Sequence, residues 1–309
     1  MSIYQIQNQK IVSVREKDFS KEKEMHELIE ANLGELFGLE LIDGEFEIEG
    51  YFIDSLAYDP EVKSFVILEY KKGSNFSVVD QGLHYLSLML NHKANFVLAY
   101  ITKTNKKVVL SDFDWSQVRV IFVAKSFTQY QQGATNFKDF PIELWEFARY
   151  ENGLLDVRQI QTSKKAESVT KIIKDNQTSE VVSQVKTYTV EEHFKKDWDS
   201  SKELYEDLRV KLLSIDNNLV EDPKKHYIGF KIGRLNVIGV HIHKMGLSMI
   251  LPRVQPIDLK DPEKRVTYVK DSFKHYGKHE SCYVIIEEED VDYAVFLAKQ
   301  VYTKFIQNN

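Results

Sequence analysis

The sequence is poor in cysteine and in long apolar runs, and each shortage excludes a class of protein. Its 309 residues include one cysteine, Cys282, so an internal disulfide is excluded and a reducing compartment is expected. No apolar run approaches the roughly 20 residues of a membrane-spanning helix, and no charged, apolar leader opens the chain. We therefore expect a cytoplasmic protein with no membrane partner.

Positive charge is also in short supply. The net charge is −6 and the pI is near 5.9, because 47 acidic residues outnumber 41 basic ones. This argues against a broadly basic nucleic-acid coat, although binding depends on where the basic residues lie. Glycine-rich phosphate loops are absent from the sequence. What is present, 43% hydrophobic and 12% aromatic residues, is typical of an ordered globular protein long enough for two domains.

Strand and helix patterns alternate in the first half of the chain and predict an α/β domain over residues 1–160. The expected architecture is a mixed sheet flanked by helices. Strands are expected at 48–59, 64–72, 96–102, 118–124, 142–149 and 154–160. Helices are expected at 20–37 and 77–91, with a helix or loop at 128–137.

A linker and a second domain follow. Residues 161–186 are rich in Ser, Thr, Gln and Lys and lack aromatics, which predicts a linker. Residues 187–309 predict an α+β accessory domain, whose role we expect to be substrate recognition or self-association as a homodimer. Helix starts are indicated at Thr189 and Ser200 by capping-box patterns. Its strands are expected at 227–232, 235–243, 247–251 and 282–286, and its last helix at 289–306.

One hairpin of the first domain gathers charged side chains. The strands 48–59 and 64–72 flank a four-residue turn, so opposed residues have numbers that sum to 123 and Asp54 faces Glu69. Side chains alternate along a strand, so Lys71 projects on the same face as Glu69. The run FVILEY is apolar on both faces, as in a strand covered on both sides. Charges at its end are therefore not ordinary surface residues.

The acid pair predicts a metal site. Two adjacent carboxylates raise the pKa of one of them unless a cation lies between them. Mg²⁺ and Mn²⁺ are hard ions that prefer such oxygen ligands, so one of them is the expected cofactor. The next helix starts at Ser77 and carries Gln81 and Tyr85 on one face, close to the strand ends. A metal-bound water beside these groups suits phosphodiester hydrolysis.

Three stretches carry a resemblance to a known superfamily: Asp54, Glu69-Tyr70-Lys71 and Gln81-x-x-x-Tyr85. Together they resemble the PD-(D/E)xK nucleases, in the RecB-like and NucS-like branch, over residues 19–161. The resemblance implies metal binding by the Asp and Glu, and a Lys that orients the attacking water or stabilises the transition state. It also implies that the Gln and Tyr support the lysine and the substrate. The second domain resembles one found in proteins labelled predicted transport proteins, a label without a mechanism.

The same resemblance implies a further acidic metal ligand on the first helix. Alignment of the apolar pattern gives Glu22, while Glu30 lies two turns later on nearly the same side, so both are kept. Lys72 is expected to contact the substrate, with DNA favoured over RNA. The alternative is a catalytically silent nucleic-acid-binding or protein-interaction module that retains the nuclease fold.

Overall fold

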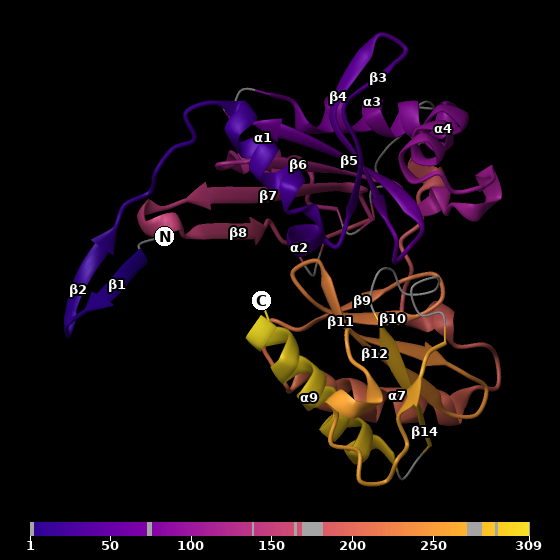
Figure 1. The fold of residues 1–309 in the computed structure, drawn as a ribbon. Coiled ribbons are helices and arrows are strands. Elements are labelled where there is room, and N and C mark those ends of the chain that lie inside the picture. The colour runs from indigo at the N-terminus through magenta and orange to yellow at the C-terminus, as the bar shows by residue number, and fades with distance from the viewer. Residues whose placement is uncertain are drawn as a thin grey trace. The chain divides into compact units, whose positions relative to one another are not determined.

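The computed structural model describes residues 3–72, 76–137, 139–163, 166–168, 182–270, 280–287 and 290–308. The chain forms two compact units, one of residues 1–59 and 63–186 and the other of residues 60–62 and 187–309. Each has its own sheet (Figure 1). Each also has an apolar core of its own. Most of the predicted linker, 164–165 and 169–181, lies outside the described residues. Among the described helices, none is long and apolar enough to cross a membrane.

The first unit is built on a six-stranded mixed sheet in the order β3-β4-β5-β6-β7-β8. β5, β6 and β7 run parallel, and the other neighbours are antiparallel. The strands are Glu40–Ile48, Tyr51–Asp59, Ser64–Lys71, Arg119–Ala124, Ile142–Arg149 and Leu155–Gln159. A separate two-stranded antiparallel ribbon is formed by β1, Ile3–Gln7, and β2, Lys10–Val14.

Helices cover both faces of this sheet, which confirms the predicted mixed sheet flanked by helices. The helices are α1 Glu22–Ala31, α2 Leu33–Phe37, α3 Val78–Asn91, α4 Lys93–Thr104 and α5 Gln129–Ala134. Val66 and Leu68 of β5 pack on the α1 and α2 side, whereas Phe65 and Ile67 pack on the α3 and α4 side. β5 is therefore buried on both faces, as its unbroken apolar run predicts.

Helix α4 corrects one prediction. The strand expected at 96–102 lies inside this helix. Its β-forming residues are spaced for a helix, because Phe96, Val97 and Tyr100 are buried while Leu98 between them is exposed. The helix ends at Asn105, which adopts the left-handed conformation of a helix C-cap.

Two further boundaries differ from the prediction. The strand expected at 48–59 starts only at Tyr51, because Glu49 and Gly50 form the turn between β3 and β4. Both have positive φ, the conformation that suits a two-residue hairpin turn. The helix expected at 20–37 is divided at Asn32 into α1 and α2. The strands β1, β2 and β3 were not predicted.

The second unit is an antiparallel six-stranded sheet in the order β13-β14-β12-β11-β10-β9. Its strands are Thr267–Tyr268, Ser281–Ile286, Leu247–Pro252, Leu235–Ile242, Ile228–Ile232 and Val220–Pro223. The core of the sheet packs against α7 and α9, Asp199–Leu213 and Val291–Asn308. The helix start expected at Thr189 leads only to a short 3-10 turn, Glu191–His193.

Other 3-10 turns are Leu110–Asp112, Trp115–Gln117, Glu151–Gly153 and Pro256–Asp258.

Candidate active site

The β4–β5 hairpin has the predicted register. Tyr58 pairs with Phe65 and Ser55 with Leu68, and the ladder between these strands ends at the second of these pairs. Asp54 lies one residue beyond that end. Its Oδ2 accepts a hydrogen bond from the backbone N–H of Tyr70 at 2.8 Å, so a side chain continues the link where backbone pairing stops.

Glu69 is the centre of the hydrogen bonding. Its side chain is buried, and Oε1 accepts hydrogen bonds from Nζ of Lys71 at 2.5 Å and from Nε2 of Gln81 at 2.7 Å. The hydroxyl of Tyr85 donates to Oε2 at 2.8 Å, and Gln81 also donates to that hydroxyl at 2.9 Å. The structure thus brings three predicted site residues onto the carboxylate of a fourth, Glu69. These donors satisfy a charge that would be costly to bury alone.

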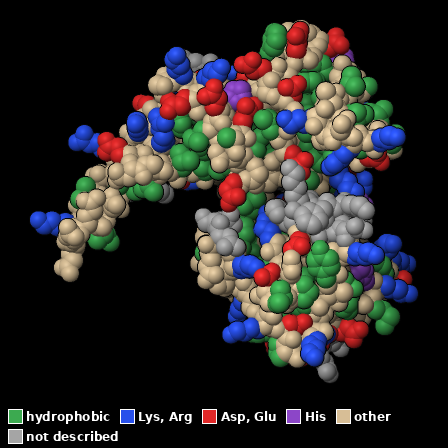
Figure 2. Space-filling view, viewed as in Figure 1, with side chains coloured by type: hydrophobic (Ala, Val, Ile, Leu, Met, Phe, Trp, Pro, Cys, Tyr) green, Lys and Arg blue, Asp and Glu red, His purple; other side chains and the backbone are tan. Residues whose placement is uncertain are grey.

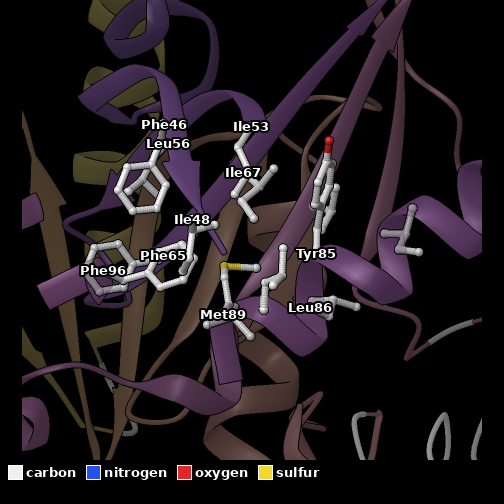
Figure 3. Packing of buried hydrophobic residues seen from close by; sticks show 14 of the residues in the cluster. Phe46, Ile48, Ile53, Leu56, Phe65, Ile67, Tyr85, Leu86, Met89 and Phe96 are labelled. Atoms are coloured by element: carbon white, nitrogen blue, oxygen red, sulfur yellow. The ribbon is translucent and has the colours of Figure 1, made fainter. Parts of the chain in front are cut away.

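Helix α3 places two of these donors. It begins at Ser77, whose hydroxyl accepts the backbone N–H of Asp80 at 3.2 Å, as the sequence predicted. Gln81 and Tyr85 follow on one face. The ring of Tyr85 belongs to the apolar cluster on this side of the sheet, and its hydroxyl points away from the aliphatic side chains (Figure 3). Burial and the charge of Glu69 raise the pKa of Tyr85, so its hydroxyl remains a donor.

Asp54 has an environment that favours a cation. Burial and the charge of Glu69 raise the pKa of Asp54 from 3.8 to about 6, while the N–H of Tyr70 and the ammonium of Lys71 act in the opposite direction. Its Oδ1 accepts no hydrogen bond from the described part of the chain. A cation beside this pair would favour the ionised form of Asp54. Two carboxylates with an open oxygen fit Mg²⁺ or Mn²⁺, which keeps several water ligands.

The two acids of α1, Glu22 and Glu30, make contacts of their own. Glu22 accepts the backbone N–H of Lys72 at 2.8 Å, and Nζ of Lys72 donates to the carbonyl of Ser20 at 2.9 Å. These bonds join the start of α1 to the end of β5. Within the ranges that the structure describes, no group of three or more His, Cys, Asp or Glu gathers to hold a metal ion. Which acid of α1 completes a metal site stays a prediction.

A polar cluster that the sequence interpretation did not single out lies between α1 and the sheet. The hydroxyl of Ser55 donates to Oε1 of Glu30 at 2.7 Å, and it lies 3.0 Å from the hydroxyl of Tyr70 and 3.1 Å from Nε2 of His26. The same His26 nitrogen is 2.9 Å from Oε1 of Glu30, and the ring stacks on Tyr70. One signal could have found it: His26 and Glu30 are four residues apart on one helix face.

Lysines close to the site are partly neutralised. Lys72 and Lys125 follow the carboxyl ends of the neighbouring parallel strands β5 and β6. Nζ of Lys125 lies 2.6 Å from Asp18 and 3.0 Å from Glu16, and the hydrogen bonds that it donates to both carboxylates raise the pKa of Lys125. Basic and acidic side chains are also interspersed over the face that Figure 2 shows. The surface in this view is not a uniformly basic one.

No model of a known protein family matches the chain. An uncharacterized protein of Haemophilus influenzae is 35% identical over 302 residues, which cover 97% of this chain and 99% of that protein. Two solved structures resemble parts of the chain. A repair endonuclease from Pyrococcus abyssi is 23% identical with a TM-score of 0.24, and the EndoMS-dsDNA2 complex is 18% identical with a TM-score of 0.25. The matches cover 43% and 47% of this chain, and 50% and 65% of those chains.

Proposed function

The chain belongs to the same family as the Haemophilus influenzae protein, and for this member we propose a divalent-metal-dependent nuclease that hydrolyses phosphodiester bonds in nucleic acid. DNA is favoured over RNA as the substrate. The observation that carries the proposal is the convergence of three donors on Glu69 beside Asp54. The resemblance of these motifs to PD-(D/E)xK nucleases supports it.

Asp54 and Glu69 are the residues that would hold Mg²⁺ or Mn²⁺, with Glu22 or Glu30 as the further ligand that the resemblance implies. When bound, the ion would polarise a phosphoryl oxygen and lower the pKa of a bound water. The two carboxylates come from different strands, and Tyr70 N–H orients the one on β4. The chain therefore supplies a pair of oxygen ligands with fixed directions.

Lys71 supplies positive charge beside this pair. Its ammonium lies 2.5 Å from Oε1 of Glu69, and its side chain is 24% exposed, compared with 5% for that of Glu69. The ammonium therefore stands between a buried carboxylate and the solvent from which a substrate approaches. Negative charge grows on the phosphoryl oxygens in the transition state, and a cation already held there stabilises it. Lys72, the next residue, would contact a substrate phosphate.

Gln81 and Tyr85 hold the carboxylate of Glu69 in one orientation. They bond different oxygens of it and are joined to each other by a hydrogen bond. A carboxylate has about four acceptor positions, and the three donors leave one for a cation. Such outer partners tune a metal ligand without contacting the metal. The predicted contact of Gln81 and Tyr85 with the substrate would use the same helix face.

A cleavage panel tests the proposal. Single-stranded, duplex and branched DNA and RNA are incubated with Mg²⁺ or Mn²⁺ and with wild-type, Asp54→Ala or Asp43→Ala protein. Asp43 is an exposed acid of the same sheet and serves as the matched control. We expect metal-dependent cleavage of at least one DNA substrate by the wild type and the control, and none by Asp54→Ala. Absence of cleavage by the wild type would favour the silent binding module.

A further inference from the structure

We propose that four residues between α1 and the sheet, namely His26 and Glu30 of α1, Ser55 of β4 and Tyr70 of β5, form a positioning cluster that fixes the separation of the two acids Asp54 and Glu69. The expected effect of this cluster on metal affinity rests on the proposed function. The expected effect on the geometry of the β4–β5 hairpin does not. None of the four need contact the substrate or the cation, because each acts through a neighbour in the chain.

Backbone hydrogen bonds between β4 and β5 do not by themselves fix the separation of Asp54 and Glu69. The ladder between β4 and β5 ends at the pair of Ser55 and Leu68. Within the described hairpin, the link beyond that pair is made by side chains. Oδ2 of Asp54 accepts the N–H of Tyr70 at 2.8 Å, and the hydroxyls of Ser55 and Tyr70 lie 3.0 Å apart. The separation of the strands at the acids therefore depends on these side-chain bonds.

The hydrogen bonds of the cluster run in one direction. The hydroxyl of Ser55 has one proton and gives it to Glu30, so the hydroxyl of Tyr70 is the donor in its contact with Ser55. Ser55 in turn donates to Oε1 of Glu30, and Nε2 of His26 reaches the same oxygen. A series of hydrogen bonds that all donate in the same direction and end on a carboxylate has one best geometry. It therefore fixes the orientation of every member.

Packing does not require these polar groups. Ser55 and Tyr70 are fully buried, and the same side of the sheet is otherwise filled by apolar residues such as Val66, Leu68 and Ile29. Buried hydroxyls are tolerated only when they are hydrogen-bonded, so an apolar pair would be simpler to accommodate. What the hydroxyls add over an apolar pair is a fixed geometry between β4, β5 and α1.

The cluster is connected to the site along both strands. Ser55 follows Asp54 in the chain, and Tyr70 lies between Glu69 and Lys71. Neighbouring side chains of a strand leave on opposite faces, so anchoring Ser55 and Tyr70 on the α1 side sets the directions of the acids on the other side. Functional groups must be held within about 0.5 Å of their productive geometry. Under this proposal Glu30 acts through Ser55, and Glu22 would be the acid of α1 that holds the metal.

The experiment compares Ser55→Ala and Tyr70→Phe with the wild type through two measurements. One is the hydrogen exchange rate of the Tyr70 amide relative to other amides of the sheet, and the other is the dissociation constant for Mn²⁺ by titration calorimetry. Tyr58→Phe is the matched control, since Tyr58 lies on β4 and faces the other core. Ser55→Thr, which keeps a hydroxyl where Ser55→Ala removes it, tests whether a hydroxyl at this position is sufficient for wild-type behaviour.

We expect both cluster variants to accelerate exchange of the Tyr70 amide selectively by about 10-fold or more, since that bond would open locally. The dissociation constant for Mn²⁺ should rise by about 10- to 100-fold, as for other partners of metal ligands. The Tyr58 control should change neither quantity, and Ser55→Thr should recover both.

Unchanged exchange and unchanged Mn²⁺ affinity in both variants would overturn the positioning role, as would a uniform acceleration across the whole sheet. If Ser55→Ala does not fold, Tyr70→Phe, which removes one oxygen and keeps the ring, tests the role by the same two measurements. Selective acceleration in a protein whose wild type binds no Mn²⁺ would support the positioning role and contradict the nuclease. A failure of the positioning role can therefore be distinguished from a failure of the proposed nuclease function.

Discussion

At the scale of residues, Glu69 joins two elements through one carboxylate. It belongs to β5, and it accepts hydrogen bonds from Lys71 of the same strand and from Gln81 and Tyr85 of α3. The sequence could predict that these side chains converge, because strand alternation and helical spacing are local rules. It could not predict the positions of Ser55 and Tyr70 in a separate cluster. Their partners on α1 are 25 residues or more away from Ser55 in the chain.

Replacement of Lys71 should separate catalysis from metal binding. In Lys71→Ala, we expect the single-turnover cleavage rate to fall by about 10²- to 10³-fold, because a preorganised charge beside the transition state is lost. The dissociation constant for Mn²⁺ should stay the same or fall, since the ammonium no longer competes for Oε1 of Glu69. Lys107→Ala, at an exposed lysine of the same unit, is the control. Wild-type turnover in Lys71→Ala would contradict the role given to this residue.

At the scale of elements, local patterns predicted most of the first unit and failed where context decides. The β5 strand and helix α3 were predicted because an unbroken apolar run and a Ser77 cap are strong signals. The residues of α4 predict a strand because Phe, Val, Tyr and Ile favour strands, while the burial of the segment follows a helix. The β3 strand was missed because charged residues occupy much of its exposed face.

The packing of α3 on the sheet gives a test at this scale. A Cβ at Gly82 would be closer than van der Waals contact to Cδ1 of Ile142 and 3.3 Å from Phe122. Alanine favours a helix over glycine by about 1 kcal/mol, but overpacking costs about 1–3 kcal/mol. We therefore expect Gly82→Ala to lower the free energy of unfolding in denaturant titrations, and Ile142→Val in the same protein to restore part of it.

Gly133 of α5 is the matched control, because nothing lies within 4 Å of a Cβ placed there. Gly133→Ala should leave the free energy of unfolding unchanged or raise it slightly. A Gly82→Ala protein that is as stable as the Gly133→Ala protein would mean that the helix does not approach the sheet this closely. The positions of Gln81 and Tyr85 on either side of Gly82 would then need revision.

At the scale of the whole molecule, each of the two units has a core of its own. The strands β10, β11, β12 and β14 and the helices of the second unit were predicted to within two residues, because apolar runs and glycine turns are local signals. The edge strands β9 and β13 were missed. They contain few apolar residues and owe their conformation to the strand beside them, which no local pattern reveals.

The second unit should lose stability in acid through His241. Burial, followed by the charge of His243, lowers the pKa of His241 from 6.5 to about 4. The unfolded chain binds this proton more readily than the folded one, so stability is complete above pH 6.5 and falls as the pH drops toward 4. We expect a loss of about 1–3 kcal/mol across that window. Hydrogen exchange of the β11 and β12 amides, corrected for intrinsic rates, measures it.

The His241→Gln protein should show a smaller loss over the same window, whereas His92→Gln, in the first unit, should behave as the wild type does in β11 and β12. Equal pH dependence in the wild type and in His241→Gln would show that other groups cause the acid sensitivity of this unit. Such a result would leave the proposed site of the first unit untouched.

Titration of Mn²⁺ into the wild-type protein and into Asp54→Asn tests whether Asp54 and Glu69 form a site for a hard cation, on which the proposed hydrolysis depends. We expect binding at one site or more in the wild type and the loss of that binding in Asp54→Asn, with Asp43→Asn binding as the wild type does. Absence of binding in the wild type, or equal binding in Asp54→Asn, would contradict the proposed metal site.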